Sequence, residues 1–294
     1  MKNILVVTGG AGFIGSNLIE NLLKFKKYKI ISLDNYRTGK TLNHIKSLRV
    51  KYIKGDTKNC ESLLKNYKNQ IHTIFHFGEF ARIYQSFKRI NECFTSNIEG
   101  SSALFHFALK NKIKIVYSAT SASLGNKGHD MNLSPYAFTK AKNLELLENL
   151  KTWFNFKYEV VYFYNVYGPR QISKGDMATV VGIFEEHYKN KKKLPVVKPG
   201  TQTRRFTHVT DTVLACIFAW KKNKNKHYSI FSRQSLSIIE LAKMFKTAVY
   251  YLPQRKGERF ASALSRMNLN NKIVRLYAKI KIKDYINNFL KNNY

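Results

Sequence analysis

The sequence predicts an α/β protein, with a doubly wound parallel sheet followed by a smaller C-terminal α/β cap. Three observations predict this fold. An apolar run occupies residues 3–8, a glycine-rich turn, TGGAGFIG, follows at 8–15, and apolar runs then alternate with helical patterns as far as residue 166. Strands that alternate with helices form βαβ units, whose strands lie parallel in one sheet. With 294 residues, of which 44% are hydrophobic, the chain can bury a large core.

The first elements follow from short apolar segments. Residues 3–8 (NILVVT) are continuously apolar, which is typical of a parallel strand buried on both faces. Residues 13–24 form a helix, because their apolar side chains recur at helical spacing, at Ile14, Leu18, Ile19 and Leu22. Further strands are expected at 29–34, 52–56 and 73–78, with a short helix around Leu63 and Leu64.

The later elements continue the alternation. We expect a long helix at 91–111, a strand at 113–120, a helix at 135–154 and a strand at 159–166. Ser134 and Pro135 suit the N-cap and first position of the third of these. After Gly168-Pro169 the alternation breaks up. We therefore assign 1–166 to a nucleotide-binding domain, to which 204–220 returns as a strand and helix at 206–220, and 167–294 mainly to a second, substrate-binding domain.

The composition limits the classes of function. The formal net charge of +33 would suit nucleic acid, an anionic membrane or a phosphate-bearing substrate. We favour a simpler explanation, an A/T-biased genome rich in lysine, asparagine, isoleucine and tyrosine codons, because the lysines are scattered and form no basic arm. We therefore expect no nucleic-acid partner and no membrane partner. The basic, amphipathic stretch 270–294 is expected to be a packed helix, with a membrane-surface role as the less favoured alternative.

Cysteine use and hydropathy indicate the compartment. Cys60, Cys93 and Cys216 lie far apart, in neither a zinc spacing nor a disulfide framework. No apolar run reaches the length of a membrane span, and glycines by residue 9 leave no signal segment. We expect a soluble cytoplasmic protein without a metal ion.

The glycine-rich turn predicts a dinucleotide site. Gly9, Gly12 and Gly15 lie between the first strand and the first helix. Glycine lets the chain turn tightly and lets main-chain amides approach a pyrophosphate, which then sits at a helix N-terminus. The spacing is GxxGxxG rather than GxGxxG, but the strand–turn–helix context makes the signal strong.

An acid at the end of the second strand indicates which dinucleotide binds. There the Asp34 carboxylate would accept hydrogen bonds from the adenosine ribose and would repel a 2′-phosphate, which favours NAD over NADP. The alternative is an ordinary loop acid. Asp56, after the third strand, is a weaker candidate for contact with the adenine amine.

Tyr136 and Lys140 lie one helical turn apart on the predicted helix 135–154. A free tyrosine, with a pKa of about 10, is a poor base at neutral pH, but a nearby ammonium and an oxidised nicotinamide both favour the phenolate. Tyr136 can then take a proton from a substrate hydroxyl while hydride leaves to the cofactor, and Lys140 would also hold the nicotinamide ribose.

Four hydroxyl side chains lie at the end of the fifth strand: Ser118, Thr120, Ser121 and Ser123. We expect one of them to bind the reacting oxygen and the rest to cap a turn.

Together these motifs resemble those of the extended short-chain dehydrogenases, in the branch of NAD-dependent nucleotide-sugar epimerases and dehydratases. The resemblance covers nearly the whole chain and implies a Rossmann fold with a substrate-binding cap. The matching segments are TGGAGFIG, LDNYRTG (33–39), GD (55–56), FHFG (75–78), Asn97, YSATSASLG (117–125), YAFTK (136–140), YNVYGPRQ (164–171), RRFTHVTD (204–211) and QRKGE (254–258).

The resemblance implies a role for individual residues. Thr120 would be the catalytic hydroxyl, Tyr136 the acid/base and Lys140 its partner. The NAD site would be lined by Gly9, Gly12, Phe13, Ile14, Gly15, Asp34, Asn35, Asp56, Thr57, Phe77, Gly78, Asn97, Tyr136, Lys140 and Tyr164. The substrate would be bound by Thr120, Asn165, Arg204 and Arg255, the last three at the nucleotide diphosphate or the sugar. Guanidinium groups suit a pyrophosphate because they bind phosphate oxygens bidentately.

The resemblance also narrows the reaction. It implies that dehydratases and many decarboxylases carry an acid just after the catalytic hydroxyl, where Ser121 and Ala122 stand here. The reductase/epimerases that make GDP-fucose place a cysteine in this loop and prefer NADP, and this loop has no cysteine. We therefore expect a 4-epimerase that works by transient C4 oxidation, rotation of the 4-keto sugar and hydride return, on a nucleotide-diphosphate sugar, with a UDP-sugar favoured, in surface polysaccharide synthesis. The alternatives are a decarboxylase, dehydratase or C4 reductase of the same branch and, less favoured, an idle NAD-binding sensor or nucleic-acid binder.

Several positions depart from the family pattern. Glu79 and Arg82 follow the fourth strand, where small residues are usual. Glu79 is expected either to face the sugar or cofactor or to pair with Arg82. Arg205 stands where an aspartate is common, and residues 230–233 replace a glycine-rich turn. The resemblance further implies a homodimer built on the helices at 91–111 and 135–154.

Overall fold

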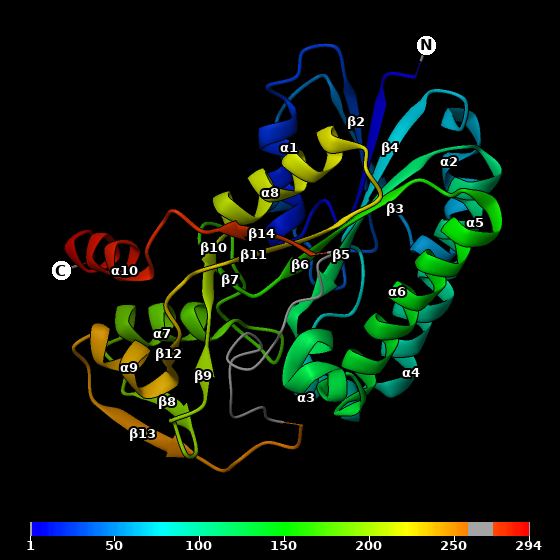
Figure 1. The fold of residues 1–294 in the computed structure, drawn as a ribbon. Helices are drawn as coiled ribbons and strands as arrows, with labels where there is room; N and C mark the ends of the chain where they lie inside the picture. The colour runs from blue at the N-terminus through cyan, green and yellow to red at the C-terminus, as the bar shows by residue number, and fades with distance from the viewer. Residues whose placement is uncertain (1, 258–272, 294) are drawn as a thin grey trace.

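The computed structural model describes residues 2–257 and 273–293, without the side chains of residues 125–129. Its centre is an eight-stranded sheet in the order β14-β11-β6-β5-β4-β1-β2-β3, and these strands pair in parallel (Figure 1). The strands are β1 (Ile4–Thr8), β2 (Lys29–Asp34), β3 (Val50–Lys54), β4 (Ile71–His76), β5 (Lys114–Thr120), β6 (Tyr158–Phe163), β11 (His227–Phe231) and β14 (Ile273–Tyr277). The strand order reverses between β1 and β4, and ligands of such sheets bind in the crevice at that point.

Two helices cover one face of the sheet. α1 (Phe13–Leu22) and α8 (Val209–Lys222) lie side by side on it (Figure 1). Their apolar sides join buried residues of the strands, such as Leu5 and Val161, in one core. α1 begins directly after the glycine turn, with Gly12 as its N-cap. The turn therefore directs the N-terminus of this helix to the crevice.

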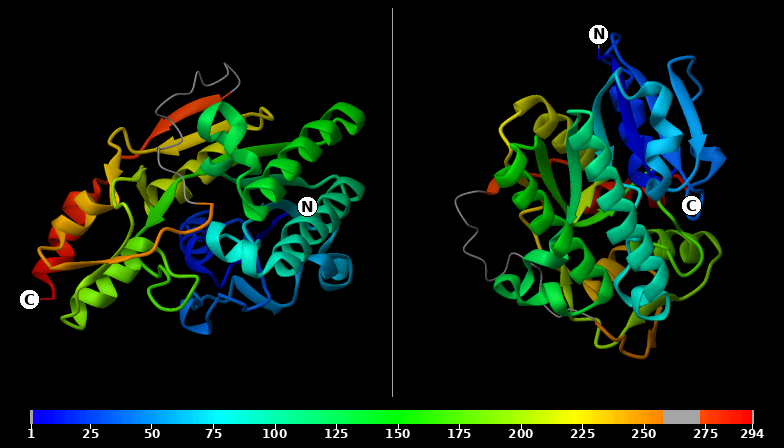
Figure 2. Two further views of the ribbon diagram at one scale, coloured as in Figure 1. Left: turned by 90° about the horizontal axis from the view of Figure 1, so that it is seen from below. Right: turned by 90° about the vertical axis from the view of Figure 1, so that its right-hand side faces the viewer.

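The other face carries α2 (Cys60–Leu64), α5 (Gly100–Lys110) and α6 (Pro135–Phe154). The last two run side by side along the sheet (Figure 2). Two short helices, α3 (Ile83–Lys88) and α4 (Ile90–Phe94), precede them. α6 begins as the sequence predicts, because Ser134 accepts a hydrogen bond from the amide of Ala137 and proline occupies the first turn.

The cap lies at the carboxyl end of the sheet (Figure 1). It has a separate core that includes Phe184, Phe245 and Ile286. Its elements are α7 (Val180–Lys189), β8 (Leu194–Val197), β9 (Thr203–Arg204), β12 (Leu236–Ser237), α9 (Ile238–Met244), β13 (Val249–Leu252) and α10 (Ile282–Lys291). β13 pairs in parallel with β8, and β12 pairs antiparallel with β9. A small parallel pair, β7 (Asn165–Tyr167) and β10 (Phe206–His208), stands between sheet and cap.

The predicted fold class is confirmed, and the differences are local. The third strand begins and ends two residues earlier than expected, at Val50–Lys54. The helix expected at 91–111 is interrupted by a π-helical turn at Thr95–Glu99, and the strand expected at 159–166 is broken after Phe163. The segment 204–220 returns to the main sheet only through its helix, because α8 packs on that sheet while β10 pairs with β7 outside it. Two later strands, β11 and β14, belong to the main sheet.

The C-terminal stretch, predicted to be one packed helix, is so only in part. Ile273–Tyr277 is strand β14 of the main sheet, and the helix α10 follows at Ile282–Lys291. α10 buries Ile282, Ile286 and Leu290 against the cap. Residues 270–272 and 294, like Glu258 of the QRKGE segment, lie outside the described residues. In the part of the chain that the structure describes, no helix is long and apolar enough to cross a membrane.

Candidate active site

A cavity of about 490 Å³ opens where the carboxyl ends of the strands face the cap. Most of the residues assigned to the site from the sequence line it. They are Gly9, Gly12, Phe13, Ile14, Gly15, Asp34, Asn35, Thr57, Phe77, Gly78, Thr120, Tyr136, Lys140, Tyr164, Asn165, Arg204 and Arg255. The two that do not are Asp56 and Asn97.

The glycine turn forms one end of this cavity. Gly9 has a φ of +68°, and a Cβ on Gly15 would overlap the carbonyl oxygen of Gly9. Only glycine fits such a close approach. No side chain caps α1 and its first turn holds no acid, so its first amides are available to a pyrophosphate. The turn therefore fits the diphosphate of a dinucleotide.

Asp34 stands beside the glycine turn at the end of β2. Its carboxylate is nearly buried and accepts hydrogen bonds from the main-chain amides of Ala11 and Tyr36. Burial raises the pKa of Asp34, and these hydrogen bonds lower it. The side chain lines the cavity, where it suits a ribose with free hydroxyls rather than a ribose 2′-phosphate.

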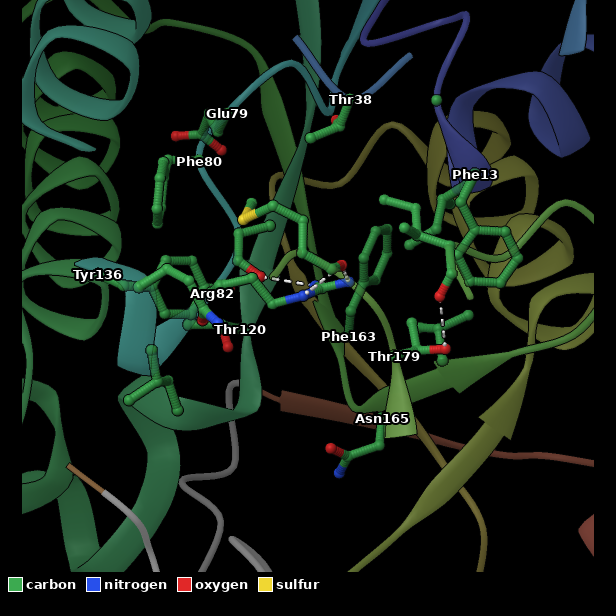
Figure 3. Close-up of a pocket in the computed structure, with 18 of the residues that line it drawn as sticks. Phe13, Thr38, Glu79, Phe80, Arg82, Thr120, Tyr136, Phe163, Asn165 and Thr179 are labelled. Atoms are coloured by element: carbon green, nitrogen blue, oxygen red, sulfur yellow. Dashed lines mark hydrogen bonds between the residues drawn. The ribbon is translucent and has the colours of Figure 1, made fainter. Parts of the chain in front are cut away.

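Three polar residues meet at the other end of the cavity: Thr120 at the end of β5, and Tyr136 and Lys140 on α6 (Figure 3 shows the first two). Burial raises the pKa of Tyr136 to about 12. A hydrogen bond from Thr120 and the charge of Arg82 lower that pKa, while the charge of Glu79 raises it. These side chains can hold a substrate oxygen and exchange a proton with it.

The hydroxyl groups of β5 and the following turn differ in their hydrogen-bond partners. Ser118 Oγ donates to the carbonyl of His76 at 2.9 Å, and Ser123 Oγ donates to the carbonyl of Thr120 at 2.7 Å. Both side chains are thus bound to the main chain. Thr120 Oγ1, by contrast, lies at Tyr136 and also accepts from the Ala122 amide.

Of the two alternatives considered for Glu79, the ion pair with Arg82 is not formed. Glu79 pairs with Lys140, and the two side chains are 3% and 4% exposed. Arg82 donates from Nε and Nη2 to the carbonyl of Met177, at 2.9 and 2.5 Å. Figure 3 shows Glu79 above Phe80. Both charged residues line the cavity.

Asp56 and Asn97 are not among the residues that line the cavity. Asp56 accepts from Asn35 Nδ2 at 3.0 Å and caps a turn of 3₁₀ helix. Asn97 is fully buried and exchanges hydrogen bonds with the main chain of Phe80, at 2.7 and 3.1 Å. Each of the two therefore contacts a lining residue, Asn35 or Phe80, without lining the cavity itself.

Some lining residues were not anticipated from the sequence. Phe163 ends β6, and Thr179 caps α7 by accepting from the Gly182 amide at 3.1 Å. Thr179 lies opposite Phe13 in Figure 3. A threonine before an apolar run is a helix-start signal, but nothing local places it at the cavity. Among the described residues, no group of three histidine, cysteine or acidic side chains could hold a metal ion.

A parallel sheet with a glycine turn at its switch point and an acid at the end of β2 is typical of a dinucleotide-binding protein. Residues 5–231 match the model of the NAD dependent epimerase/dehydratase family, and the chain belongs to this family. Its cofactor is NAD, which the glycine turn and Asp34 fit.

The relatives include different activities. An uncharacterized UDP-glucose epimerase of Bacillus subtilis, YtcB, is 31% identical over 229 residues, which are 71% of this chain and 70% of the relative. The human dTDP-D-glucose 4,6-dehydratase is 28% identical over 257 residues, 81% of this chain and 72% of the relative. A solved UDP-glucose 4-epimerase of Thermotoga maritima, with UDP-glucose, superposes with a TM-score of 0.87 and 25% identity over 98% of this chain and 97% of its own. The family comprises nucleotide-sugar epimerases, dehydratases and decarboxylases.

Proposed function

We propose that this protein is an NAD-dependent nucleotide-sugar 4-epimerase whose substrate is a UDP-sugar. One observation carries the choice of reaction. The carboxylates in the described lining are Asp34, Glu79 and Glu92. Main-chain amides hold Asp34, and Glu79 pairs with Lys140. Glu92 pairs with Arg37 and Arg89. No described carboxylate is therefore free beside Tyr136 to take a proton from C5, which elimination of water requires.

The side chains present suit a reversible oxidation at C4. NAD, when bound, accepts the hydride from C4 and returns it to the opposite face of the sugar. Tyr136 takes the proton of the 4-hydroxyl group in the first half-reaction and returns it in the second. Thr120 donates to the same oxygen, and the Lys140 ammonium lies one helical turn from Tyr136. The complete cycle therefore takes up and releases no net proton.

The choice of a UDP-sugar rests on the relatives and on two arginines that line the cavity. Arg204 and Arg255 line the cavity, and arginine suits a diphosphate. The Thermotoga maritima enzyme, which aligns over nearly the whole chain, was solved with UDP-glucose. Both points favour a nucleotide diphosphate held along the cap.

The test is turnover without added cofactor. The purified protein is incubated with UDP-, GDP-, dTDP- and CDP-sugars while NMR follows the anomeric protons. We expect a C4 epimer of a UDP-sugar with no net NADH. Loss of water or CO2, or a requirement for added NADH, would instead assign one of the other family activities.

A pair of variants assigns the chemistry to Tyr136. Tyr136→Phe should abolish turnover while the protein still binds NADH, because only the proton carrier is removed. Tyr188→Phe is the matched control, since Tyr188 packs against Phe245 and Phe289 in the cap core. Full activity of Tyr136→Phe would refute the proposed chemistry.

A further inference from the structure

The Glu79 carboxylate is the meeting point of a buried polar cluster behind Tyr136. Its Oε1 accepts from Ser101 Oγ at 2.9 Å, from Tyr117 OH at 3.0 Å and from Asn143 Nδ2 at 3.0 Å. Its Oε2 accepts from Lys140. These donors come from α5, β5 and α6, so one carboxylate joins three elements. Only the ionised form can accept from all four.

The hydrogen-bond directions behind Glu79 form a consistent chain. Thr8 Oγ1 accepts from the amides of Phe77 and Gly78, so its own proton goes to His76 Nδ1, at 2.8 Å. His76 Nε2 then carries the proton and donates to Ser101 Oγ at 2.9 Å, and Ser101 donates to Glu79. A single histidine tautomer satisfies every group. Thr8, the first residue of the glycine-rich turn, is thus connected to the Glu79 carboxylate that holds Lys140.

Lys140 is held from two sides. Its ammonium donates to Glu79 and to the carbonyl of Ser118, and it lies 4.2 Å from the centre of the Tyr117 ring. An ammonium has three donors, and Lys140 lines the cavity. The third donor can therefore serve a group bound there. Without a partner, an ammonium as buried as this one would be costly to keep charged.

From this arrangement we infer that Glu79 is a positioning residue. It fixes the Lys140 ammonium beside Tyr136, keeps it charged, and so sets the pH range in which the two residues work together. This inference rests on the proposed function only for the assay that follows sugar turnover.

Few groups near Tyr136 carry charge in a neutral assay. Burial lowers the pKa of His76 to about 4, raises that of Cys93 to about 11, and raises that of Tyr117 well above 10. Among the described side chains, the charged neighbours of Tyr136 are therefore Glu79, Lys140 and Arg82. The Glu79 charge raises the pKa of Tyr136 and also that of Lys140, whose pKa burial lowers. Loss of this charge should move both groups in the same direction.

The decisive variant is Glu79→Gln, which keeps the shape and removes the charge. Sugar oxidation needs Tyr136 deprotonated and Lys140 protonated, so both limbs of the pH–kcat profile should move to lower pH. Two controls keep the charge of Glu79. Ser101→Ala removes one of its donors, and Glu159→Gln breaks another buried pair, Lys114–Glu159, at 3.2 Å. In both controls the two limbs of the pH–kcat profile should stay at their wild-type pH. A Glu79→Gln profile at the wild-type pH would overturn the inference.

A second variant covers the case in which Glu79→Gln does not fold. Glu79→Asp keeps the charge but withdraws the carboxylate from Lys140. We expect the basic limb of the pH–kcat profile to move less than in Glu79→Gln, because the charge stays and only the hydrogen bond to Lys140 is lost. We expect a kcat lower by roughly 100-fold, the loss that a displacement of about 1 Å can cause. A wild-type kcat and NADH affinity in this variant would contradict the inference.

NADH binding separates this inference from the proposed function. Fluorescence titration of NADH against pH needs no sugar. If the wild type binds NADH but epimerises no sugar, the proposed function fails, while Glu79→Gln should still move the basic limb of NADH affinity to lower pH. An unmoved limb in that titration would refute the role of Glu79 alone.

Discussion

The carboxylate of Asp34 accepts a hydrogen bond from the main-chain amide of Ala11 at 2.9 Å, which joins the end of β2 to the glycine turn. Its second oxygen accepts from the amide of Tyr36 at 2.8 Å. Amides, and not a cation, therefore hold this acid in the cavity wall. Its negative charge is left to act on the cofactor.

Asp34→Asn should weaken NADH binding by roughly 10- to 100-fold, the range expected for a hydrogen bond to a charged group. Binding of NADPH should weaken less, because the repulsion of the 2′-phosphate is removed. The matched control is Asp211→Asn, since Asp211 is another buried aspartate that accepts from two main-chain amides, at 3.0 and 2.9 Å, outside the cavity lining. Fluorescence titration with both cofactors measures the change, and an unaltered preference for NADH would contradict the role given to Asp34.

Local signals were enough to predict α6 and the residues it carries. Ser134 and Pro135 mark the first turn of the helix, and Tyr136 and Lys140 follow at a fixed spacing. The partner of Lys140 could not be predicted in this way, because Glu79 lies 61 positions earlier in the chain. Only the packing of β4, β5 and α6 brings the two together.

The sequence pattern of the family does not show which of its residues line the cavity. Asn97 belongs to the pattern, but it contacts Phe80 without lining the cavity itself. A sequence pattern cannot distinguish a lining residue from one that supports the lining. α3 was not anticipated, because a helix of six residues at Ile83–Lys88 is too short to show a clear periodicity.

The buried His76 should make the protein sensitive to acid. Its pKa is lowered to about 4 by burial, whereas an unfolded histidine has a pKa of about 6.5. The unfolded chain therefore binds this proton first as the pH falls. The contribution to stability is present above about pH 6.5 and is lost progressively toward pH 4, by about 3 kcal/mol.

Urea unfolding at pH 7.5 and pH 5 measures this loss. In His76→Gln the fall in unfolding free energy between the two pH values should be smaller than in the wild type. His106→Gln, which changes an exposed histidine of α5, should keep the wild-type difference. An equal fall in His76→Gln and wild type would show that other groups cause the acid sensitivity.

A pair of phenylalanines marks the face on which we propose a homodimer. Phe94 of α4 and Phe138 of α6 stack at 6.2 Å and are 36% and 37% exposed, and Ile90 beside them is 47% exposed. Phe138→Glu should convert a dimer to a monomer, because it places a charge in an apolar contact. Light scattering after size exclusion gives the mass. Leu214→Glu, at a 49% exposed leucine of α8 on the opposite face, should remain dimeric, and a monomeric wild type would refute the proposal.

Residues 169–179 cross the cavity from α1 to α3, and we call them the crossing segment. At the α1 end, the Pro169 carbonyl accepts from Asn17 Nδ2 at 3.0 Å and Arg170 pairs with Glu20 at 2.8 Å. At the α3 end, Gln85 Nε2 donates to the Asp176 carbonyl at 2.5 Å, and Arg89 pairs with the Asp176 carboxylate at 3.3 Å. Ile172 between these ends lines the cavity, as do Met177, Ala178 and Thr179 at the end of the segment. A dinucleotide in the cavity would lie beneath it.

The contacts at the α3 end should therefore slow the release of the cofactor. We predict that the double variant Gln85→Ala/Asp176→Ala releases NADH about three- to tenfold faster, since each lost hydrogen bond contributes about 1 kcal/mol or less at an exposed position. Association should change little, because contact mutations act mainly on dissociation rates. Stopped-flow displacement of NADH measures the rate. Lys174→Ala is the control, because Lys174 lies in the same segment but pairs with Glu186 of α7. A double variant that releases NADH at the wild-type rate would show that the segment does not retain the cofactor.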